Sequence, residues 1–257
     1  MSGPEAPNLM NMRRLDLGAA FEFVRNDPQW LKKVFLHGVM NMIPVLGVLC
    51  TWGWTRRAYQ LARQGQHESL PEIDWGQELS DGIAPFVASL NPSLVLMPLM
   101  MLWLIVSVAT VAALEAGGPV LADLTPVAMV ALQGLMVVGF GFIHAMLPEM
   151  LRHGYNGELL PLRHLGRSLR TIWANPGAYA LTCVGVLLSN VIGSLGFLLF
   201  GFGVFLTLPL GQLMSAHIIA QWDSIVEQHE RGSVKVQSPE VARNTQRLHE
   251  ARVETSR

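Results

Sequence analysis

Three times along the chain, a short amphipathic stretch ends at an Asp-Pro or Asn-Pro step and is followed at once by apolar sequence. The steps are Asp27-Pro28, Asn91-Pro92 and Asn175-Pro176. Proline disfavours helical geometry at the residue before it, so each step predicts a helix break, and the Asp or Asn can cap the next helix. An amphipathic helix, a turn and an apolar segment are together typical of a chain that lies on a membrane surface and then enters the bilayer.

Apolar segments and the placement of charge predict how the chain crosses that bilayer. A hydrocarbon core of ~30 Å takes about 20 helical residues to cross. Four segments are long enough: Ser93–Leu114, Pro126–Leu147, Ala178–Leu199 and Phe202–Ala220. All 18 Lys and Arg residues lie in the ranges 1–33, 55–92, 148–177 and 221–257. Because cytoplasmic loops carry an excess of Lys and Arg, we expect a multi-pass protein of the cytoplasmic (inner) membrane with both termini in the cytoplasm.

The first apolar stretch, Val34–Trp54, allows more than one arrangement. A single crossing would separate the basic residues before it from Arg56 and Arg57 after it, against the charge rule. A hairpin that turns at Ile43–Gly47 keeps both flanks cytoplasmic. The basic side chains on these flanks would then reach toward the headgroups: Lys32, Lys33, Arg56 and Arg57. A single crossing, a hairpin and a re-entrant loop remain open, and the charge rule favours the hairpin.

We therefore predict an all-α integral membrane fold of three helical hairpins, the first short or re-entrant, each preceded by an amphipathic interfacial helix. The membrane domain covers residues 15–222 in three pseudo-repeats, 15–64, 70–150 and 160–222. Residues 1–14 form a polar N-terminal segment. Because apolar periodicity is lost after Gly232, residues 223–257 are expected to form a polar, partly disordered cytoplasmic tail.

The predicted interfacial helices differ in charge. The helix of residues 162–173 places Arg163, Arg167 and Arg170 on one face, at spacings of four and three. Acidic residues lie before or within the helix of residues 79–90: Glu72, Asp74, Glu78 and Asp81. We therefore expect this acidic helix and the basic helix to pack against each other. The three arginines are candidate contacts for anionic lipid headgroups or for a protein partner on the cytoplasmic face. Nucleic acid is not expected, because membrane topology explains these arginines better.

Four short segments in the first half of the chain are similar to a known family. They are Ile43-Pro44-Val45-Leu46-Gly47, Gly53-Trp54-Thr55-Arg56-Arg57, Leu70-Pro71-Glu72-Ile73-Asp74-Trp75 and Asp81-Gly82. They resemble the I-P-x-x-G, G-[YW]-x-x-R, L-P-x-W/D and D-G segments of a family of uncharacterised prokaryotic multi-pass membrane proteins, a domain of unknown function. The resemblance covers about residues 15–222, with Trp54 where Tyr is commoner. It implies an integral cytoplasmic-membrane protein and no activity, so no catalytic residue is carried over.

Polar residues inside apolar segments are costly, and each is therefore a site candidate. The candidate intramembrane polar site consists of His37, Asn41, His144, Glu149, Asn190, Gln212 and His217. Convergence of His37, His144 and His217 with Glu149 would allow metal binding or proton relay. Hydrogen bonding between helices is the simpler interpretation of the same residues.

No sequence pattern of a common catalytic or cofactor site occurs. The chain has no P-loop, no GxSxG, no HExxH and no Cys/His zinc spacing. We expect no enzyme, no catalytic residue, no metal and no cofactor. The leading hypothesis is a non-enzymatic scaffold or accessory protein that presents interfacial helices to lipid or to a partner. The alternative is a small transporter or channel with a polar site at the membrane midplane.

Overall fold

The structure is a computed structural model that describes residues 15–115, 119–198 and 203–254. The predicted N-terminal segment 1–14 lies outside these residues, as do residues 116–118 between α4 and α5 and residues 199–202 before α8. Within them, the chain is all-α. Its elements are α1 (Leu17–Arg25), α2 (Trp30–Met40), α3 (Leu46–Arg63), α4 (Trp75–Glu115), α5 (Pro119–Tyr155), the 3-10 turn η2 (Pro161–His164), α6 (Leu165–Ala174), α7 (Pro176–Leu195), the 3-10 turn η3 (Gly196–Leu198) and α8 (Val204–Glu254).

Three helical stretches in the described chain are long and apolar enough to cross a membrane, so the protein is a membrane protein. They are Met129–Tyr155, Pro176–Leu198 and Val204–Arg231. The predicted segment Ser93–Leu114 lies in α4, and the apolar stretch found there, Met100–Ala112, is shorter than these three.

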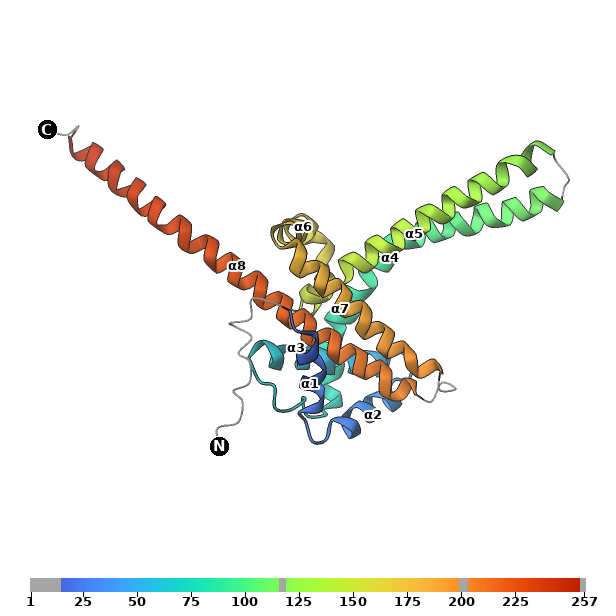
Figure 1. Ribbon diagram of the computed structural model, residues 1–257, viewed down its shortest axis with the longest axis horizontal. Helices are drawn as coiled ribbons and strands as arrows, with labels where there is room; N and C mark the ends of the chain where they lie inside the picture. Colours follow the sequence, from blue (N-terminus) through green and yellow to red (C-terminus); the bar gives the residue numbers. More distant parts are fainter. Residues whose placement is uncertain (1–14, 116–118, 199–202, 255–257) are drawn as a thin grey trace.

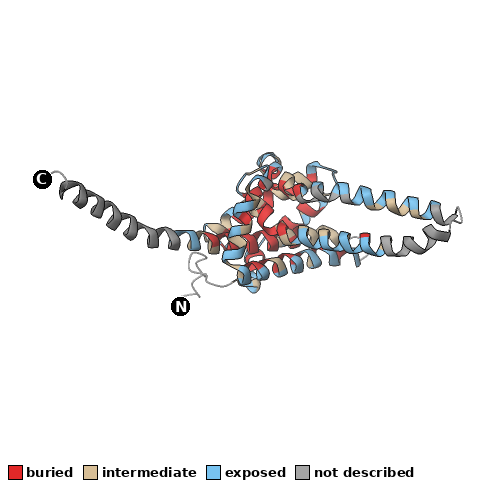
Figure 2. Cartoon of the chain, turned by 90° about the horizontal axis from the view of Figure 1, so that it is seen from above, coloured by how far each residue is buried: buried red, intermediate tan, exposed pale blue. Residues whose placement is uncertain are grey.

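Helix α8 forms the centre of the molecule, with α1, α2, α3 and α7 packed against it (Figure 1). The core holds Phe23 of α1, Trp54 and Tyr59 of α3, and Leu213 and Ile218 of α8, all at most 1% exposed. Figure 2 shows the buried residues gathered where these helices meet. The helical body is therefore held together by ordinary apolar burial around one helix.

One antiparallel helix pair projects from this body, and a second pair is part of it. Helices α4 and α5 form a long hairpin that projects away from it, while α7 lies along α8 (Figure 1). Along the projecting hairpin, apolar side chains such as Leu94, Met97 and Val137 are 59–63% exposed. Such surfaces are stable in contact with lipid tails, which suits the membrane assignment.

Helix ends fall at two of the three predicted breaks. Helix α1 ends before Asp27-Pro28, and α6 gives way to α7 at Asn175-Pro176. The third prediction was wrong, because α4 continues through Asn91-Pro92 without a break. Asn91 Nδ2 donates to Val87 O at 2.9 Å and to Leu159 O at 3.1 Å. These bonds add donors beside the proline and tie α4 to the segment after α5, so tertiary contacts hold the helix straight there.

The first apolar stretch is divided between two helices. Residues 41–45 separate α2 from α3. A Cβ atom on Gly47 would lie 1.9 Å from Met40 O, so this tight turn requires glycine. Helix α2 has 11 residues and is about 17 Å long, which is too short to cross a hydrocarbon core alone.

The polar segment after residue 222 continues helix α8, which runs without interruption to Glu254. The tail is polar, but it contains many Glu, Arg and Gln residues, which are good helix formers. Helix propensity can therefore maintain a helix where an apolar face is missing.

Candidate functional site

A buried cluster of charged residues joins α5 to α8. The carboxylate of Glu149 accepts hydrogen bonds from the Arg152 guanidinium at 2.7 and 3.1 Å and from Trp222 Nε1 at 2.9 Å. Arg152 also donates to Asp223 Oδ1 at 2.9 Å. The side chains of Glu149 and Asp223 are only 0% and 3% exposed, so their partners stabilise the charges in place of water. The predicted site residue Glu149 is an ion-pair partner that holds helices together.

Helix α3 joins the same cluster through Asp223. Asp223 Oδ2 accepts hydrogen bonds from Tyr59 Oη at 2.5 Å and from Arg63 Nε at 3.0 Å. Burial and the adjacent negative charge of Asp223 raise the pKa of Tyr59 well above its usual value. The phenol therefore stays protonated and acts as a hydrogen-bond donor, not as a base.

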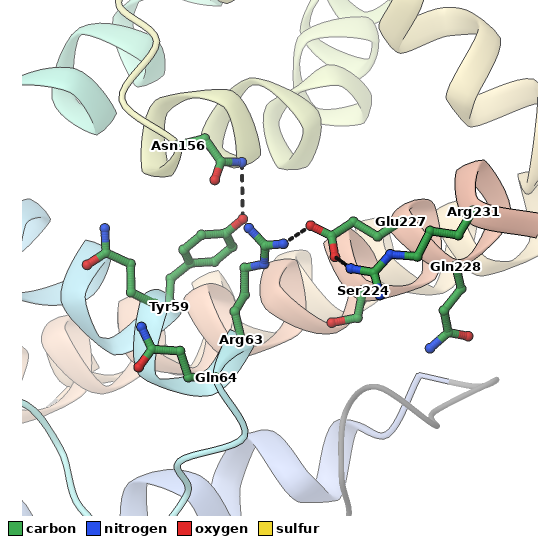
Figure 3. Close-up of a pocket in the computed structure, with 9 residues that line it drawn as sticks. Tyr59, Arg63, Gln64, Asn156, Ser224, Glu227, Gln228 and Arg231 are labelled. Atoms are coloured by element: carbon green, nitrogen blue, oxygen red, sulfur yellow. Dashed lines mark hydrogen bonds and ion pairs between the residues drawn. The ribbon is translucent and has the colours of Figure 1, made fainter. Parts of the chain in front are cut away.

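A polar pocket of about 620 Å³ lies beside this cluster (Figure 3). Arg63 pairs with Glu227, and Glu227 also accepts from Arg231 at 3.2 Å. Asn156 Nδ2 donates to Tyr59 Oη at 3.2 Å across the pocket. The charges of Arg63, Glu227 and Arg231 largely compensate one another, so the pocket is polar without a large excess of either sign.

A second buried ion pair fixes the segment between α3 and α4. Lys33 Nζ donates to Asp27 Oδ2 at 2.9 Å, to Leu70 O at 3.0 Å and to Glu72 Oε1 at 2.8 Å. Burial alone would raise the pKa of Asp27, but bonds from Lys33 and from the backbone N–H groups of Gln29 and Leu70 lower it below its usual value. Burial opposes the charge of Lys33, and its two acidic partners raise its pKa. Lys33 was predicted to reach the headgroups, but it is buried in this cluster instead.

The first two predicted site residues, His37 and Asn41, have local partners. The His37 ring stacks on Trp54 with centroids 3.8 Å apart, and its Nε2 lies 3.2 Å from Glu78 Oε2. Asn41 Oδ1 accepts from Thr51 at 2.8 Å. Both residues therefore connect the short helices of the first repeat.

The acidic residues before and in α4 pair with the first repeat rather than with the basic helix α6. Glu78 lies 3.8 Å from Arg57, and Asp81 lies 3.2 Å from Arg56. Glu78 and Asp81 therefore form their ion pairs with α3, although α4 also contacts η2, the start of the predicted basic helix. The basic residues of α3 are closer in the fold.

His217 contacts a different set of residues from His37 and His144. Its ring packs on Phe23 at 4.9 Å and on His67 at 5.4 Å, and its Nδ1 lies 3.1 Å from Gln221 Nε2. The seven predicted polar residues do not form one site. Within the described ranges, no group of three or more His, Cys, Asp or Glu side chains could hold a metal ion.

Three predicted residues do come together. His144 of α5, Asn190 of α7 and Gln212 of α8 line one cavity of about 290 Å³. His144 Nδ1 donates to Phe140 O at 2.9 Å, because a carbonyl oxygen can only accept. This cavity lies where five helices meet, and it receives residues from α3 and α4 as well.

The three predicted arginines lie on the surface at η2 and α6. Arg163, Arg167 and Arg170 are exposed, and no ion pair of the described residues engages them. The opposite face of α6 packs on the body through Ile172, which contacts the cluster around Trp222. Arg167 and Arg170 also line a cavity of about 370 Å³ between α6 and α8, together with His229 and Glu230 of α8.

Sequence reasoning missed Tyr59, Arg152 and Asp223 as members of the charged cluster. Two of them had a usable signal. Arg152 follows Glu149 by three residues, the spacing of side-chain pairs on a helix. Asp223 is the first acid after a long apolar segment. The pairing of Asp223 with α3 is a contact over 164 residues, which no local pattern indicates.

Comparison with known proteins gives a family and no activity. The family described as "Protein of unknown function (DUF4013)" matches residues 36–217, well over half of the chain. No curated protein and no solved structure is significantly similar to the chain.

Proposed function

The chain belongs to this DUF4013 family of unknown function, and we propose that it is a non-enzymatic scaffold or accessory protein of the cytoplasmic membrane. Three helical hairpins enter the bilayer from the cytoplasmic side, and α2 with α3 forms a shallow re-entrant hairpin. Both termini stay in the cytoplasm. The distribution of Lys and Arg along the chain supports this arrangement.

The exposed arginines of η2 and α6 carry the proposal. In the described part of the chain, most other cationic side chains are ion paired: Lys33, Arg56, Arg57, Arg63, Arg152 and Arg231. Arg163, Arg167 and Arg170 are left with exposed charge on one face. We propose that this face binds anionic lipid headgroups, since each basic side chain near an anionic surface contributes about 1 kcal/mol.

The position of α6 in the chain supports a contact at the level of the headgroups. Trp173 at its end is 76% exposed, and α7, one of the apolar helices, begins three residues later. Tryptophan is enriched at membrane interfaces, where its ring contacts both tails and headgroups. On the cytoplasmic face, the pocket of Figure 3 offers a protein partner a polar surface whose rim carries Arg231, 70% exposed.

Native mass spectrometry of the full chain in detergent, titrated with phosphatidylglycerol or phosphatidylcholine, tests the lipid contact. We expect the chain to prefer phosphatidylglycerol. The variant R163Q/R167Q/R170Q is expected to lose that preference by about 100-fold, because three charges at about 1 kcal/mol each are removed. Higher salt is expected to weaken binding to the unaltered chain more than to the variant.

The variant R25Q/K32Q is the matched control, since both residues are exposed cations on other helices without an ion pair in the described chain. It is expected to keep the preference for phosphatidylglycerol. Equal losses in both variants would show nonspecific attraction, and an unchanged preference in the triple variant would refute the proposed contact.

A second candidate function is a small transporter or channel, which the cavity lined by His144, Asn190 and Gln212 favours. Proteoliposome flux of small solutes distinguishes it from the scaffold. Transport through the cavity requires flux that His144→Ala reduces and that the arginine variant leaves intact. The scaffold predicts no flux above that of empty liposomes.

A further inference from the structure

The cavity between the helix pairs has more than three polar residues in its wall. Besides the predicted residues, Tyr155 at the end of α5 and Ser215 of α8 line it. Trp52 of α3 and Ser89 of α4 complete the contributions from five helices. A cavity built from every long element of the body is part of the fold, not a gap at its edge.

Three polar atoms that belong to lining residues lack a hydrogen-bond partner among the residues that the structure describes. They are Tyr155 Oη, Gln212 Oε1 and Ser215 Oγ, each buried at the level of the atom. Tyr155 and Ser215 are only 1% and 5% exposed as whole residues. Buried polar groups in proteins are almost always satisfied, because a missing bond leaves the cost of desolvation uncompensated. Three such atoms around one cavity indicate a ligand that supplies the missing partners.

The remaining wall restricts the chemistry of that ligand. It is largely apolar, with side chains such as Ile143, Leu147, Leu151, Val186 and Leu208. Among the described lining residues there is no Asp, Glu, Lys or Arg. A charged group would lose its hydration without gaining a counter-ion, so a neutral ligand fits and an ionised one does not. The volume of about 290 Å³ equals about ten water molecules at ~30 Å³ each.

The surroundings indicate where the rest of such a ligand would lie. Next to lining residues, α5 exposes Phe140 at 58%, and α7 exposes Leu187 at 56% and Val191 at 48%. The α4–α5 hairpin projects away from the α7–α8 pair (Figure 1). An acyl chain can follow these apolar helix faces within the membrane, whereas a small soluble polyol gains nothing from them.

We propose that this cavity binds the hydroxylated head of a neutral glycerol lipid, with its acyl chain along the exposed faces of α5 and α7. Tyr155 donates to an ester or hydroxyl oxygen of the head. Gln212 Oε1 accepts from a hydroxyl group, and Ser215 donates or accepts. This binding site is independent of the arginine face of α6 and of any transport.

Photolabelling of the full chain in nanodiscs tests the proposal. The probe is a monoacylglycerol with a diazirine in its acyl chain, and the competitors are monooleoylglycerol, glycerol and phosphatidic acid. We expect saturable labelling of peptides from α5, α7 and α8. Monooleoylglycerol should compete, whereas phosphatidic acid should be at least tenfold weaker and glycerol should have no effect.

Variants connect the labelling to the three unsatisfied atoms. Tyr155→Phe and Ser215→Ala each remove one hydroxyl group, and each is expected to weaken competition by monooleoylglycerol about tenfold. Neither should destabilise the lipid-free protein, because the hydroxyl groups have no partner there. Ser194→Ala, at an exposed position of α7, is the matched control and should bind as the unaltered chain does.

Each contrary result overturns the proposal. Labelling that does not saturate, or that the variants leave unchanged, would show that the cavity holds only water. Competition by glycerol as strong as that by monooleoylglycerol would assign the site to a free polyol. Stronger competition by phosphatidic acid would contradict the argument from the uncharged wall.

Discussion

Replacing Lys33 by methionine removes the one charge that compensates Asp27 among the described residues. Lys33 Nζ lies 2.9 Å from Asp27 Oδ2 and 2.8 Å from Glu72 Oε1, and the Lys33 and Asp27 side chains are 4% and 3% exposed. Methionine has a similar length and fits the apolar part of the lysine side chain. The change therefore removes the ammonium group with little loss of packing.

The size of the effect follows from what remains around Asp27. Its carboxylate keeps two backbone donors, Gln29 N at 2.6 Å and Leu70 N at 2.8 Å. Breaking a buried ion pair by removing one partner costs roughly 3–5 kcal/mol. The two remaining donors and the 83% exposure of Glu72, which lets water approach, favour the lower end. We expect the free energy of unfolding to fall by about 3 kcal/mol.

Reversible unfolding in mixed micelles, followed by tryptophan fluorescence, measures this loss. Lys32→Met is the matched control, since the preceding lysine is exposed and should change stability by less than about 0.5 kcal/mol. In the double variant Asp27→Asn/Lys33→Met, no uncompensated charge remains, and part of the stability should return. A loss below about 1 kcal/mol for Lys33→Met, or no recovery in the double variant, would refute the reasoning.

Three further predictions concern other parts of the fold, all measured as the free energy of unfolding. Gly82→Ala should cost about 3 kcal/mol, because its Cβ would lie 1.8 Å from a backbone oxygen of α3. Gly141→Ala is the control, because a Cβ atom there would have nothing within 4 Å, and it should be neutral or stabilise the helix. An equal loss of stability in both variants would contradict the close packing of α3 and α4. Burial lowers the pKa of His67, so the unfolded chain takes up the proton first, and stability should fall as the pH drops below about 6.5. His67→Gln should reduce that slope, and an unchanged slope would assign it elsewhere. Arg152→Met should cost about 3–5 kcal/mol by leaving Glu149 buried without its cation, and Glu149→Gln in the same chain should recover part of it.

Local sequence signals predicted the helical class and several helix ends. Asp27-Pro28 lies just after α1. Asn175-Pro176 lies where α6 gives way to α7, and Pro176 is the first residue of α7, where its missing N–H group removes no helical hydrogen bond. The same step at Asn91 failed, because a contact with Leu159, 68 residues away, holds the helix together. A dipeptide rule does not include such a contact.

The charged residues show the same limit. Lys33 and Arg56 were expected at the headgroups on the basis of position, but their acidic partners follow 39 and 25 residues later. Depth in an apolar segment identified His144, Asn190 and Gln212, which share a cavity. It could not separate them from His37 and His217, because the distance between helices decides which polar residues meet.

Cysteine accessibility in intact cells tests the membrane arrangement most directly. Ser2→Cys, Ser69→Cys and Gly118→Cys are introduced singly into a chain that lacks Cys50 and Cys183. A membrane-impermeant maleimide should label only Gly118→Cys from outside, which places the charged cluster and the arginines of α6 on the cytoplasmic side. Labelling of Ser2→Cys from outside would show that the first apolar stretch crosses the membrane once, and it would contradict the arrangement of three hairpins.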